Sequence, residues 1–386
     1  MICIENAKVV LEHGILWDGI ILINEERIVS VGRRGDIVIP ASAEHVDAEG
    51  AYVGPGFVDI HAHGGGGHMY WQEPEKAAEF FLRHGTTSQF PTLYQTLDKQ
   101  TYLDSIDRIR ATIEKDGVGK AIRGLYMEGP YMNPDYGASR KKNKWLGDIC
   151  LADYKEVVDR AGTLARVWVV APERDGIEDF VRYAKSVNPE VVFSVGHSEA
   201  TPTQIRKLKK YGLNHQTHCM DATGRVPAWL GTRGVGPDEA CFLDDEMFAE
   251  MICDSGAVHV SPELQRLILK NKGLDKVVLV SDNSGRNQDN PAPERLQHMT
   301  DLSFDEWGNL GGSRLSLDLA CRNIMTHTSC GICQAFLLAS RNPARSIGMD
   351  DEIGTIETGK QADLVFVDDM FNIHNVMLSG HLLYHF

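Results

Sequence analysis

Two histidines, His61 and His63, stand two positions apart at the end of the apolar run Gly-Phe-Val-Asp-Ile. Side chains at positions i and i+2 of a strand point to the same face, so both imidazoles can reach one ion. Four glycines follow at positions 64–67, and glycine lets the backbone turn sharply beside a ligand. Paired histidines are also common on protein surfaces. The pair alone therefore does not separate a metal site from an exposed strand end.

Four further polar residues occupy the same kind of position, each at the C-terminal end of an apolar run: Glu128, His197, His218 and Asp282. All strands of a β/α barrel open onto one face, and active sites are built there. Any one of these residues could instead be a satisfied core histidine or a helix-capping carboxylate. Their recurrence at the ends of separate apolar runs favours one shared site.

The predicted site has a coherent chemistry. Imidazole and carboxylate ligands suit Zn²⁺, with Fe²⁺ as the alternative, and they leave a position open for water. A divalent ion lowers the pKa of its water from about 16 to about 7. A separate carboxylate can then take the proton and deliver it to a leaving amine, and Asp282 is our candidate for this general acid/base.

The elements that must position these residues alternate along the chain between positions 54 and 347. Strands are expected at 56–61, 88–93, 122–128, 166–171, 191–197, 214–218, 248–252 and 276–282. Helices are expected at 75–84, 98–114, 153–161, 177–186, 202–211 and 262–270. Eight strands alternating with helices favour a (β/α)8 TIM-like barrel of the α/β class, although a doubly wound open sheet would also alternate.

The two ends of the chain share a different pattern. Short β-rich runs separated by turns occupy 7–11, 20–23, 28–31, 362–367 and 376–383. We therefore expect residues 1–53 and 348–386 to form a small β-sandwich domain beside a barrel of residues 54–347.

The composition of the chain limits the classes of partner and the cellular compartment that we expect for the protein. The formal net charge of −15 argues against nucleic acid or an anionic membrane as a partner. The eight cysteines are scattered, unlike a small secreted disulfide framework, which favours reduced thiols. The N-terminus lacks the pattern of a signal peptide, and no apolar run approaches the roughly 20 residues of a membrane helix. We expect a cytoplasmic protein that acts on a small molecule.

With these residues in hand, the chain resembles the N-acetylglucosamine-6-phosphate deacetylases of the amidohydrolase superfamily nearly end to end. Among the motifs that carry the resemblance are Pro-Gly-Phe-Val-Asp-Ile-His-Ala-His-Gly-Gly (55–65), Met-Glu-Gly-Pro-Tyr-Met-Asn (127–133), Gly-His-Ser-Glu-Ala-Thr (196–201), Thr-His-Cys-Met (217–220), Val-Ser-Asp (280–282) and Asn-Pro-Ala-Arg (342–345). The resemblance implies metal-dependent deacetylation of N-acetylglucosamine-6-phosphate or a related N-acetylated amino sugar. It also implies a barrel with a terminal β-sandwich, and a homodimer in which residues are lent across the interface.

The resemblance assigns the metal ligands. Glu128, His197 and His218 would hold the principal ion, and His61 and His63 would hold a second ion in members that bind two. The chain would therefore carry one or two divalent ions.

The resemblance also assigns residues around the reaction. Asp282 would be the general acid/base, and His259 would contact the substrate, in that family near its phosphate. In the family a Gly-Ala-His or Gly-Thr-His supplies the histidine that polarises the acyl carbonyl. Here the matching stretch is Tyr-Gly-Ala-Ser-Arg (136–140), so Ser139 takes the place of that histidine, and Arg140 is a candidate substitute.

A second departure affects recognition of the substrate. The family's His-x-x-Asn-Ala-Met is here His-Cys-Met-Asp-Ala-Thr (218–223), so Asp221 precedes Ala222 where an asparagine helps hold the phosphate. Asp221 would repel a dianion. Arg225 or Arg233 could supply an anion contact, with an ordinary surface-loop arginine as the alternative for each.

Two other functions compete with sugar deacetylation. A cyclic-amide hydrolase or an aminohydrolase of base-like rings would keep the scaffold, but many of these bridge two metals with a carboxylated lysine, and here Glu128 takes that place. A non-catalytic scaffold would be expected to have lost metal ligands, whereas all six strand-end positions are occupied.

Overall fold

The computed structural model describes residues 1–286, 290 and 292–385. In these residues eight parallel strands lie side by side in the order β15-β14-β13-β12-β11-β10-β9-β6. Their bounds are β6 (Phe57–Ala62), β9 (Thr86–Tyr94), β10 (Leu125–Glu128), β11 (Ala165–Val170), β12 (Val192–Val195), β13 (Leu213–Gln216), β14 (Phe248–Ile252) and β15 (Val277–Val280). The backbone N–H of Asp282, just beyond β15, donates to the carbonyl of His61 in β6 at 2.9 Å. The barrel is therefore nearly closed.

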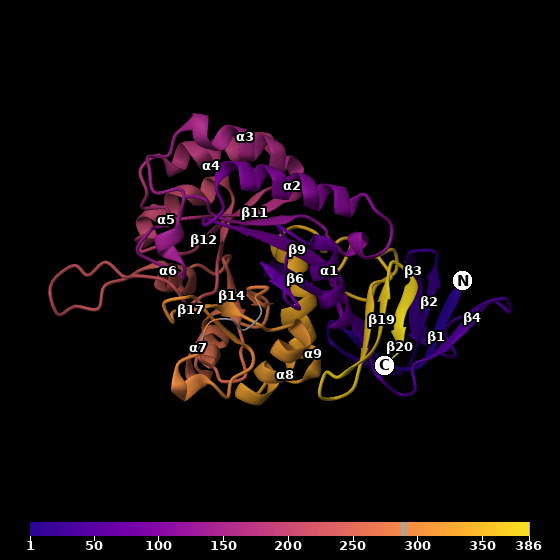
Figure 1. The fold of residues 1–386 in the computed structure, drawn as a ribbon. Helices are drawn as coiled ribbons and strands as arrows, with labels where there is room; N and C mark the ends of the chain where they lie inside the picture. Colours follow the sequence, from indigo (N-terminus) through magenta and orange to yellow (C-terminus); the bar gives the residue numbers. More distant parts are fainter. Residues whose placement is uncertain (287–289, 291, 386) are drawn as a thin grey trace.

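Helices cover the outside of the barrel, and Figure 1 shows α2, α3 and α4 lying over β11 and β12. Their bounds are α1 (Pro74–Arg83), α2 (Lys99–Ile113), α3 (Leu151–Ala161), α4 (Ile177–Val187), α5 (Pro202–Leu208), α6 (Pro237–Leu243), α7 (Pro262–Lys272), α8 (Leu317–His327), α9 (Ile332–Phe336) and α10 (Asn342–Ser346). Helix α4 buries Ile177, Phe180, Val181 and Ala184, the spacing of one helical face. Helix α5 begins with a capping box in which Thr201 and Gln204 satisfy each other's backbone N–H groups.

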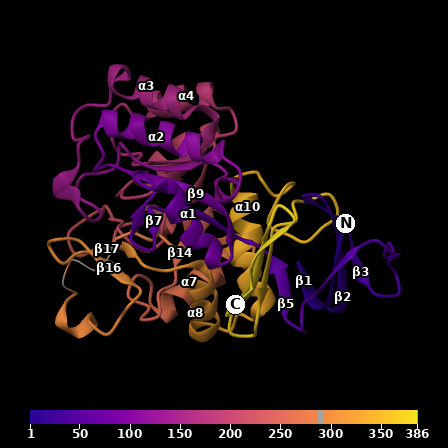
Figure 2. The same cartoon turned by 45° about the vertical axis from the view of Figure 1, so that its right-hand side comes forward.

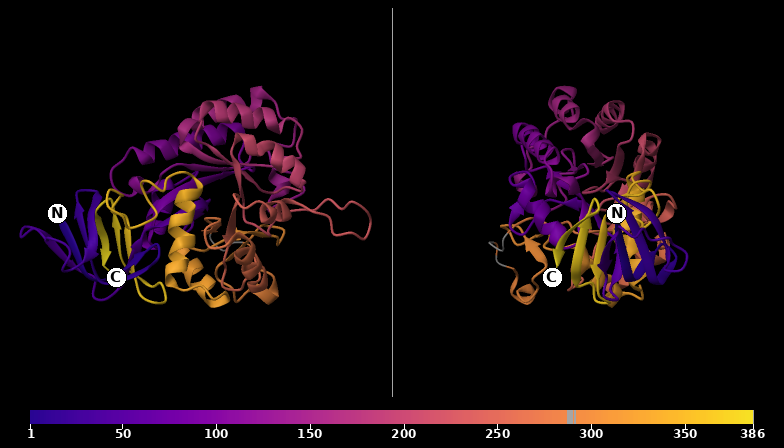
Figure 3. Two further views of the ribbon diagram at one scale, coloured as in Figure 1. Left: turned by 180° about the vertical axis from the view of Figure 1, so that it is seen from behind. Right: turned by 90° about the vertical axis from the view of Figure 1, so that its right-hand side faces the viewer.

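Strands from both ends of the chain form a second sheet beside the barrel, in the order β20-β19-β18-β5-β1-β2-β3, with β4 paired to β1 (Figures 2 and 3). Their bounds are β1 (Ile2–Leu11), β2 (Gly14–Asn24), β3 (Arg27–Arg33), β4 (Glu44–Asp47), β5 (Tyr52–Pro55), β18 (Leu364–Val367), β19 (Ile373–Leu378) and β20 (His381–His385). The sheet curls back on itself, because the N–H of Ile28 in β3 donates to the carbonyl of Lys360 at 3.0 Å. Ile4, Ile21 and Leu364 are among the side chains that fill the space it encloses.

Two short hairpins complete the fold at the open end of the barrel. They pair β7 (Gly64–Gly65) with β8 (His68–Met69) and β16 (Leu302–Phe304) with β17 (Leu310–Ser313). The first turns at Gly66 and Gly67, whose φ angles of 61° and 89° suit glycine. Among the described residues, no helix is both long enough and apolar enough to cross a membrane.

The predicted TIM-like barrel with a separate sheet from both termini is confirmed, and its eight predicted strands all form. One predicted element is wrong. The run 376–383 is not a single strand, because the chain turns at Ser379 and Gly380, with φ angles of 48° and 77°, between β19 and β20. Helices α6, α8, α9 and α10 were not predicted.

Candidate active site

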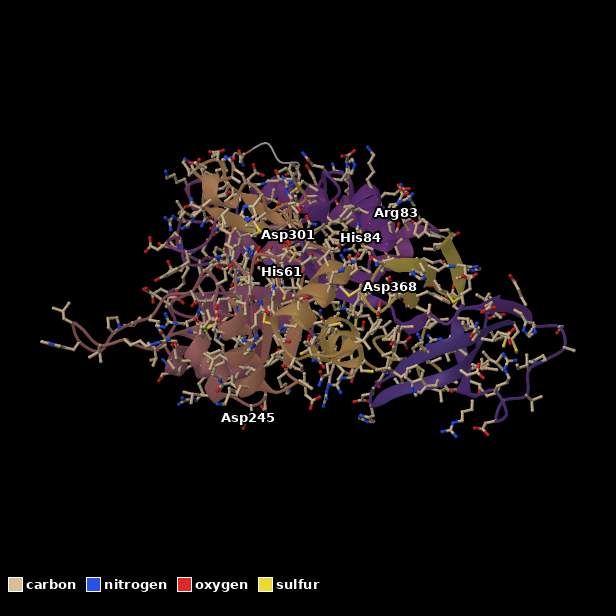
Figure 4. The ribbon with its side chains drawn as sticks, turned by 90° about the horizontal axis from the view of Figure 1, so that it is seen from below. His61, Arg83, His84, Asp245, Asp301 and Asp368 are labelled. Atoms are coloured by element: carbon tan, nitrogen blue, oxygen red, sulfur yellow. The ribbon has the colours of Figure 1, made fainter. Side chains whose placement is uncertain are left out.

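A cavity of about 250 Å³ lies at the C-terminal ends of the barrel strands. It is lined by Glu128 together with His63, His197, His218 and Asp282, and on its other sides by residues that include Trp71, Tyr94, Ser139, Asp221, Ala222 and Arg286. His61 is fully buried and lies within the barrel part of the molecule (Figure 4). The structure thus gathers all six strand-end residues into one place.

Glu128 is the residue on which the histidines converge. Its Oε1 atom lies 2.8 Å from His197 Nε2 and 3.3 Å from His218 Nε2. Its Oε2 atom lies 3.0 Å from His63 Nε2 and 3.5 Å from His61 Nε2. Two triplets of potential ligands, one on each side of this carboxylate, therefore share Glu128.

The donor set fits a divalent metal ion. The Nε2 atoms of His197 and His218 are only 3.0 Å apart, and both face the same carboxylate oxygen. Among the described residues, His61 Nε2 and Glu128 Oε2 are buried with no hydrogen-bond partner. Lone pairs that converge in this way, on imidazole and carboxylate, are the ligands that Zn²⁺ and Fe²⁺ accept.

Asp282 lies beside the second triplet. Its Oδ1 atom is 3.3 Å from His63 Nε2 and 3.5 Å from His61 Nε2. Burial alone would raise the pKa of this carboxyl, but the charge of His61 and the hydrogen bond with His63 outweigh it and hold the pKa below its ordinary value. Asp282 is therefore ionised and able to accept a proton.

Three of the site residues have an unusual backbone. His197, His218 and Asp282 have φ angles of 47°, 28° and 44°, a left-handed region that costs a non-glycine residue on the order of 1–3 kcal/mol. Each stands two residues beyond the end of its strand. The strain is held by the surrounding hydrogen bonds, such as the 2.7 Å bond from Ser313 N–H to the Asp282 carbonyl. The chain turns at these points so that the side chains face the cavity.

The metal-free site is expected to lose stability as pH rises. Burial lowers the pKa of His218, but its hydrogen bond with Glu128 and the charges of Asp221 and Glu128 raise it to about 9. A folded-state pKa above the unfolded value of about 6.5 stabilises the protein below pH 6.5, and this stability is lost as pH rises through 9. Chelator-treated protein should therefore melt at a lower temperature at pH 9 than at pH 6.5. An equal or higher melting temperature at pH 9 would contradict this.

A buried network of hydrogen bonds that the sequence did not predict holds the ring of His61 on the side of Nδ1. Glu250, in the middle of β14, lies 3.3 Å from His61 Nδ1 and accepts hydrogen bonds from the Tyr126 hydroxyl at 2.9 and 3.1 Å. His61 also stacks on Tyr126, with ring centroids 4.4 Å apart. Burial raises the pKa of Glu250, yet its hydrogen bonds with His215 and His61 bring it down to about 2. Because ionised Glu250 can accept the Nδ1 proton, it favours the His61 tautomer whose Nε2 atom carries the lone pair that a metal ion needs.

Replacement of Glu250 by glutamine should weaken metal binding at one triplet only. The amide has the same shape, but it is neutral and can turn either its oxygen or its N–H group toward His61, so it holds the Nδ1–H tautomer less firmly. Losing such a partner costs about 10- to 100-fold in metal affinity. Metal analysis after dialysis should show this loss at His61 and His63, while ions held by His197 and His218 remain. Equal loss from both triplets, or from neither, would refute this role for Glu250.

The residues predicted to contact the substrate differ in whether they line the cavity. Ser139, Asp221 and Ala222 line the cavity. His259 is buried, with its Nδ1 2.9 Å from Asp254, and it is not among the residues that line the cavity. Its Nε2 atom has no hydrogen-bond partner among the described residues.

The two predicted arginines do not reach this chain's cavity. Arg140 begins the short 3-10 helix Arg140–Lys142, is exposed, and donates to the Asp135 carbonyl at 2.8 Å. Arg233 is exposed and pairs with Glu239 at 3.4 Å. Neither arginine is among the residues that line the cavity, and a contact of either one with a substrate stays a prediction. Arg286, which the sequence patterns did not predict as a site residue, lines the cavity.

Comparisons with known proteins agree with this geometry. The model of the amidohydrolase family matches residues 52–383. The chain is 28% identical to the N-acetylgalactosamine-6-phosphate deacetylase of Escherichia coli O157:H7, over 89% of this chain and 90% of that protein. It is 25% identical to the N-acetylglucosamine-6-phosphate deacetylase of Bacillus subtilis strain 168, over 99% and 96%.

Solved structures show the same fold. The N-acetylglucosamine-6-phosphate deacetylase of Pasteurella multocida superposes with a TM-score of 0.85 at 23% identity, covering 99% of each chain. The corresponding enzyme of Thermotoga maritima gives a TM-score of 0.82 at 26% identity, covering all of both chains. The likeness includes both the barrel and the terminal sheet.

Proposed function

Because the chain belongs to the amidohydrolase family, we propose that it hydrolyses the N-acetyl amide of an amino sugar, releasing acetate and a free amine. The observation that carries the proposal is the convergence of four histidines on Glu128, with ionised Asp282 beside them. The N-acetylhexosamine-6-phosphates on which its relatives act are the first substrates to compare.

We assign the ligands by the two triplets. Glu128, His197 and His218 would hold the principal ion, and His61 and His63 would hold a second ion with Glu128. Zn²⁺ suits this set of imidazole and carboxylate donors, and Fe²⁺ is the alternative. When bound, a divalent ion lowers the pKa of water and polarises the acyl carbonyl.

Asp282 would move the proton. As the attacking water adds to the acyl carbon, the Asp282 carboxylate accepts its proton. As the carbon–nitrogen bond breaks, the protonated carboxyl returns that proton to the amide nitrogen, which leaves as an amine. Its position in the lining of the cavity, with Oδ1 3.3 Å from His63 Nε2, supports this role.

A panel of N-acetylated hexosamines, with and without a 6-phosphate, tests the proposal. Metal-loaded protein should release acetate from at least one of them, and chelation should stop the release. Ammonia release from cyclic amidines without any acetate release would instead support the aminohydrolase alternative. No turnover of any amide by metal-loaded protein would overturn the proposal.

We extend the proposal to a homodimer in the cytoplasm. The segment between β13 and α6 extends away from the barrel as a long arm (Figure 1), and it exposes Trp229 and Leu230 by 77% and 90%. Apolar side chains this exposed suit contact with a second copy of the chain, which would also receive Arg233. The eight cysteines are all free thiols, as expected in a reducing compartment.

A further inference from the structure

Asp221 lines the cavity, and its carboxylate has no partner among the described side chains. It is half-buried, lines the cavity, and follows His218 in a tight turn. That turn is fixed by its own backbone, since the Asp221 N–H donates to the His218 carbonyl at 2.9 Å and the Asp221 carbonyl lies 3.2 Å from His218 Nδ1. Within the described residues its side chain makes no hydrogen bond and no ion pair. The carboxylate is therefore available to a ligand.

Several cationic groups near Asp221 are engaged by other carboxylates. Burial lowers the pKa of His259, but its hydrogen bond with Asp254 and the charge of Asp221 raise it above its ordinary value, so the imidazole of His259 is shared between two carboxylates. The arginines of the nearby arm are engaged elsewhere, because Arg225 Nε lies 2.9 Å from Glu239 and Arg233 pairs with the same carboxylate at 3.4 Å.

Among the described residues, carboxylates also outnumber guanidinium groups in the lining of the whole cavity. Among the described residues that line it, three carry carboxylates, Glu128, Asp221 and Asp282, and one carries a guanidinium, Arg286. Glu128 and Asp282 face the histidines, whereas Asp221 does not pair with any described side chain. Among the described lining residues, Asp221 is therefore the carboxylate whose oxygens make no hydrogen bond and no ion pair and can meet a substrate.

We propose that Asp221 makes this cavity select an unphosphorylated N-acetyl amino sugar, whose hydroxyl groups donate hydrogen bonds to the carboxylate. This inference rests on the proposed function. An ionised carboxylate is an acceptor only, so it needs a donor such as a hydroxyl, and charge-assisted bonds of this kind are strong. A phosphate dianion offers acceptors in place of donors and is repelled by the like charge.

The test compares N-acetylglucosamine with N-acetylglucosamine-6-phosphate in wild-type protein, Asp221→Asn and Asp245→Asn. Asp245 is exposed and lies at the outer edge of the molecule (Figure 4), so its variant makes the same charge change away from the cavity. Wild-type protein should favour the unphosphorylated sugar in kcat/KM by at least tenfold. Asp221→Asn should lower that ratio at least tenfold, and Asp245→Asn should leave it unchanged.

A wild-type preference for the phosphorylated sugar, or an unchanged ratio in Asp221→Asn, would overturn the inference. If Asp221→Asn does not fold, the inference is tested by measuring the wild-type kcat/KM ratio of the two sugars at increasing salt concentration. At about 1 M salt the screening length falls to about 3 Å, so discrimination by charge should shrink severalfold. A kcat/KM ratio that does not change with salt concentration would also count against selection by the charge of Asp221. Absence of acetate release from both sugars in metal-loaded wild-type protein would mean that the proposed function itself has failed.

Discussion

Replacing Asp282 with asparagine should lower kcat by about 10²- to 10⁴-fold, the usual contribution of a general acid/base. The amide keeps the shape of the side chain but cannot accept the proton of the attacking water. The metal should remain, because neither triplet of converging ligands includes Asp282. The measurement is acetate release together with metal content per chain, both on the purified variant.

Asp245→Asn provides the matched control, since it removes one carboxylate from an exposed position. It should keep wild-type turnover and wild-type metal content. Near-normal turnover in Asp282→Asn would remove Asp282 from the proton-transfer role. Loss of both metal and turnover would instead show that Asp282 holds the metal.

Replacing Glu128 with glutamine should remove metal from both triplets at once. Glu128 is the residue that they share, with its two oxygens 2.8 Å from His197 Nε2 and 3.0 Å from His63 Nε2. The amide group would turn an N–H toward one pair of histidines and would leave both pairs without a counter-charge. Affinity should fall by more than the roughly 10- to 100-fold expected for loss of an outer partner.

Metal analysis after dialysis measures this effect, and Glu250→Gln is the comparison. Both variants remove a buried carboxylate beside His61, yet only Glu128 touches all four histidines. Acetate release should therefore fall to background in Glu128→Gln and only partly in Glu250→Gln. A Glu128→Gln protein that keeps its metal would contradict the assignment of Glu128 as a shared ligand.

The barrel and the meeting of the six strand-end residues could be predicted because one rule governs both. Eight apolar runs that alternate with amphipathic helices favour a parallel barrel, and the ends of the strands of such a barrel share one face. No knowledge of loop structure was needed to bring Glu128, His197 and Asp282 together. Which residue serves as ligand or as base remains a prediction.

Glu250 could not be found in this way because it lies in the middle of a strand. In Phe-Ala-Glu-Met-Ile it looks like one polar side chain in an apolar run. The pairing of β14 with β13 and β15 in the nearly closed barrel brings it within 3.3 Å of His61 Nδ1. Its partners, Tyr126 and His215, belong to two other strands. The residues of a network that spans the interior of a barrel come from strands far apart in the chain, so no fixed spacing in the sequence marks them.

Loop residues were predicted least well. Arg140 and Arg233 follow motifs that end at the cavity, but each side chain is turned outward by local contacts, with Asp135 and with Glu239. Arg286 lies four residues beyond Asp282 and does reach the cavity. Loop direction depends on tertiary contacts, which sequence patterns do not encode.

The most direct test of a metal-dependent N-deacetylase is a titration of chelated protein with Zn²⁺ while acetate release is followed. An equimolar mixture of N-acetylglucosamine and its 6-phosphate serves as substrate, so the result does not depend on which sugar is preferred. Acetate release should rise from background in proportion to added metal and level off at one or two ions per chain. Release that is unchanged by chelation, or that never appears at full metal occupancy, would contradict the account.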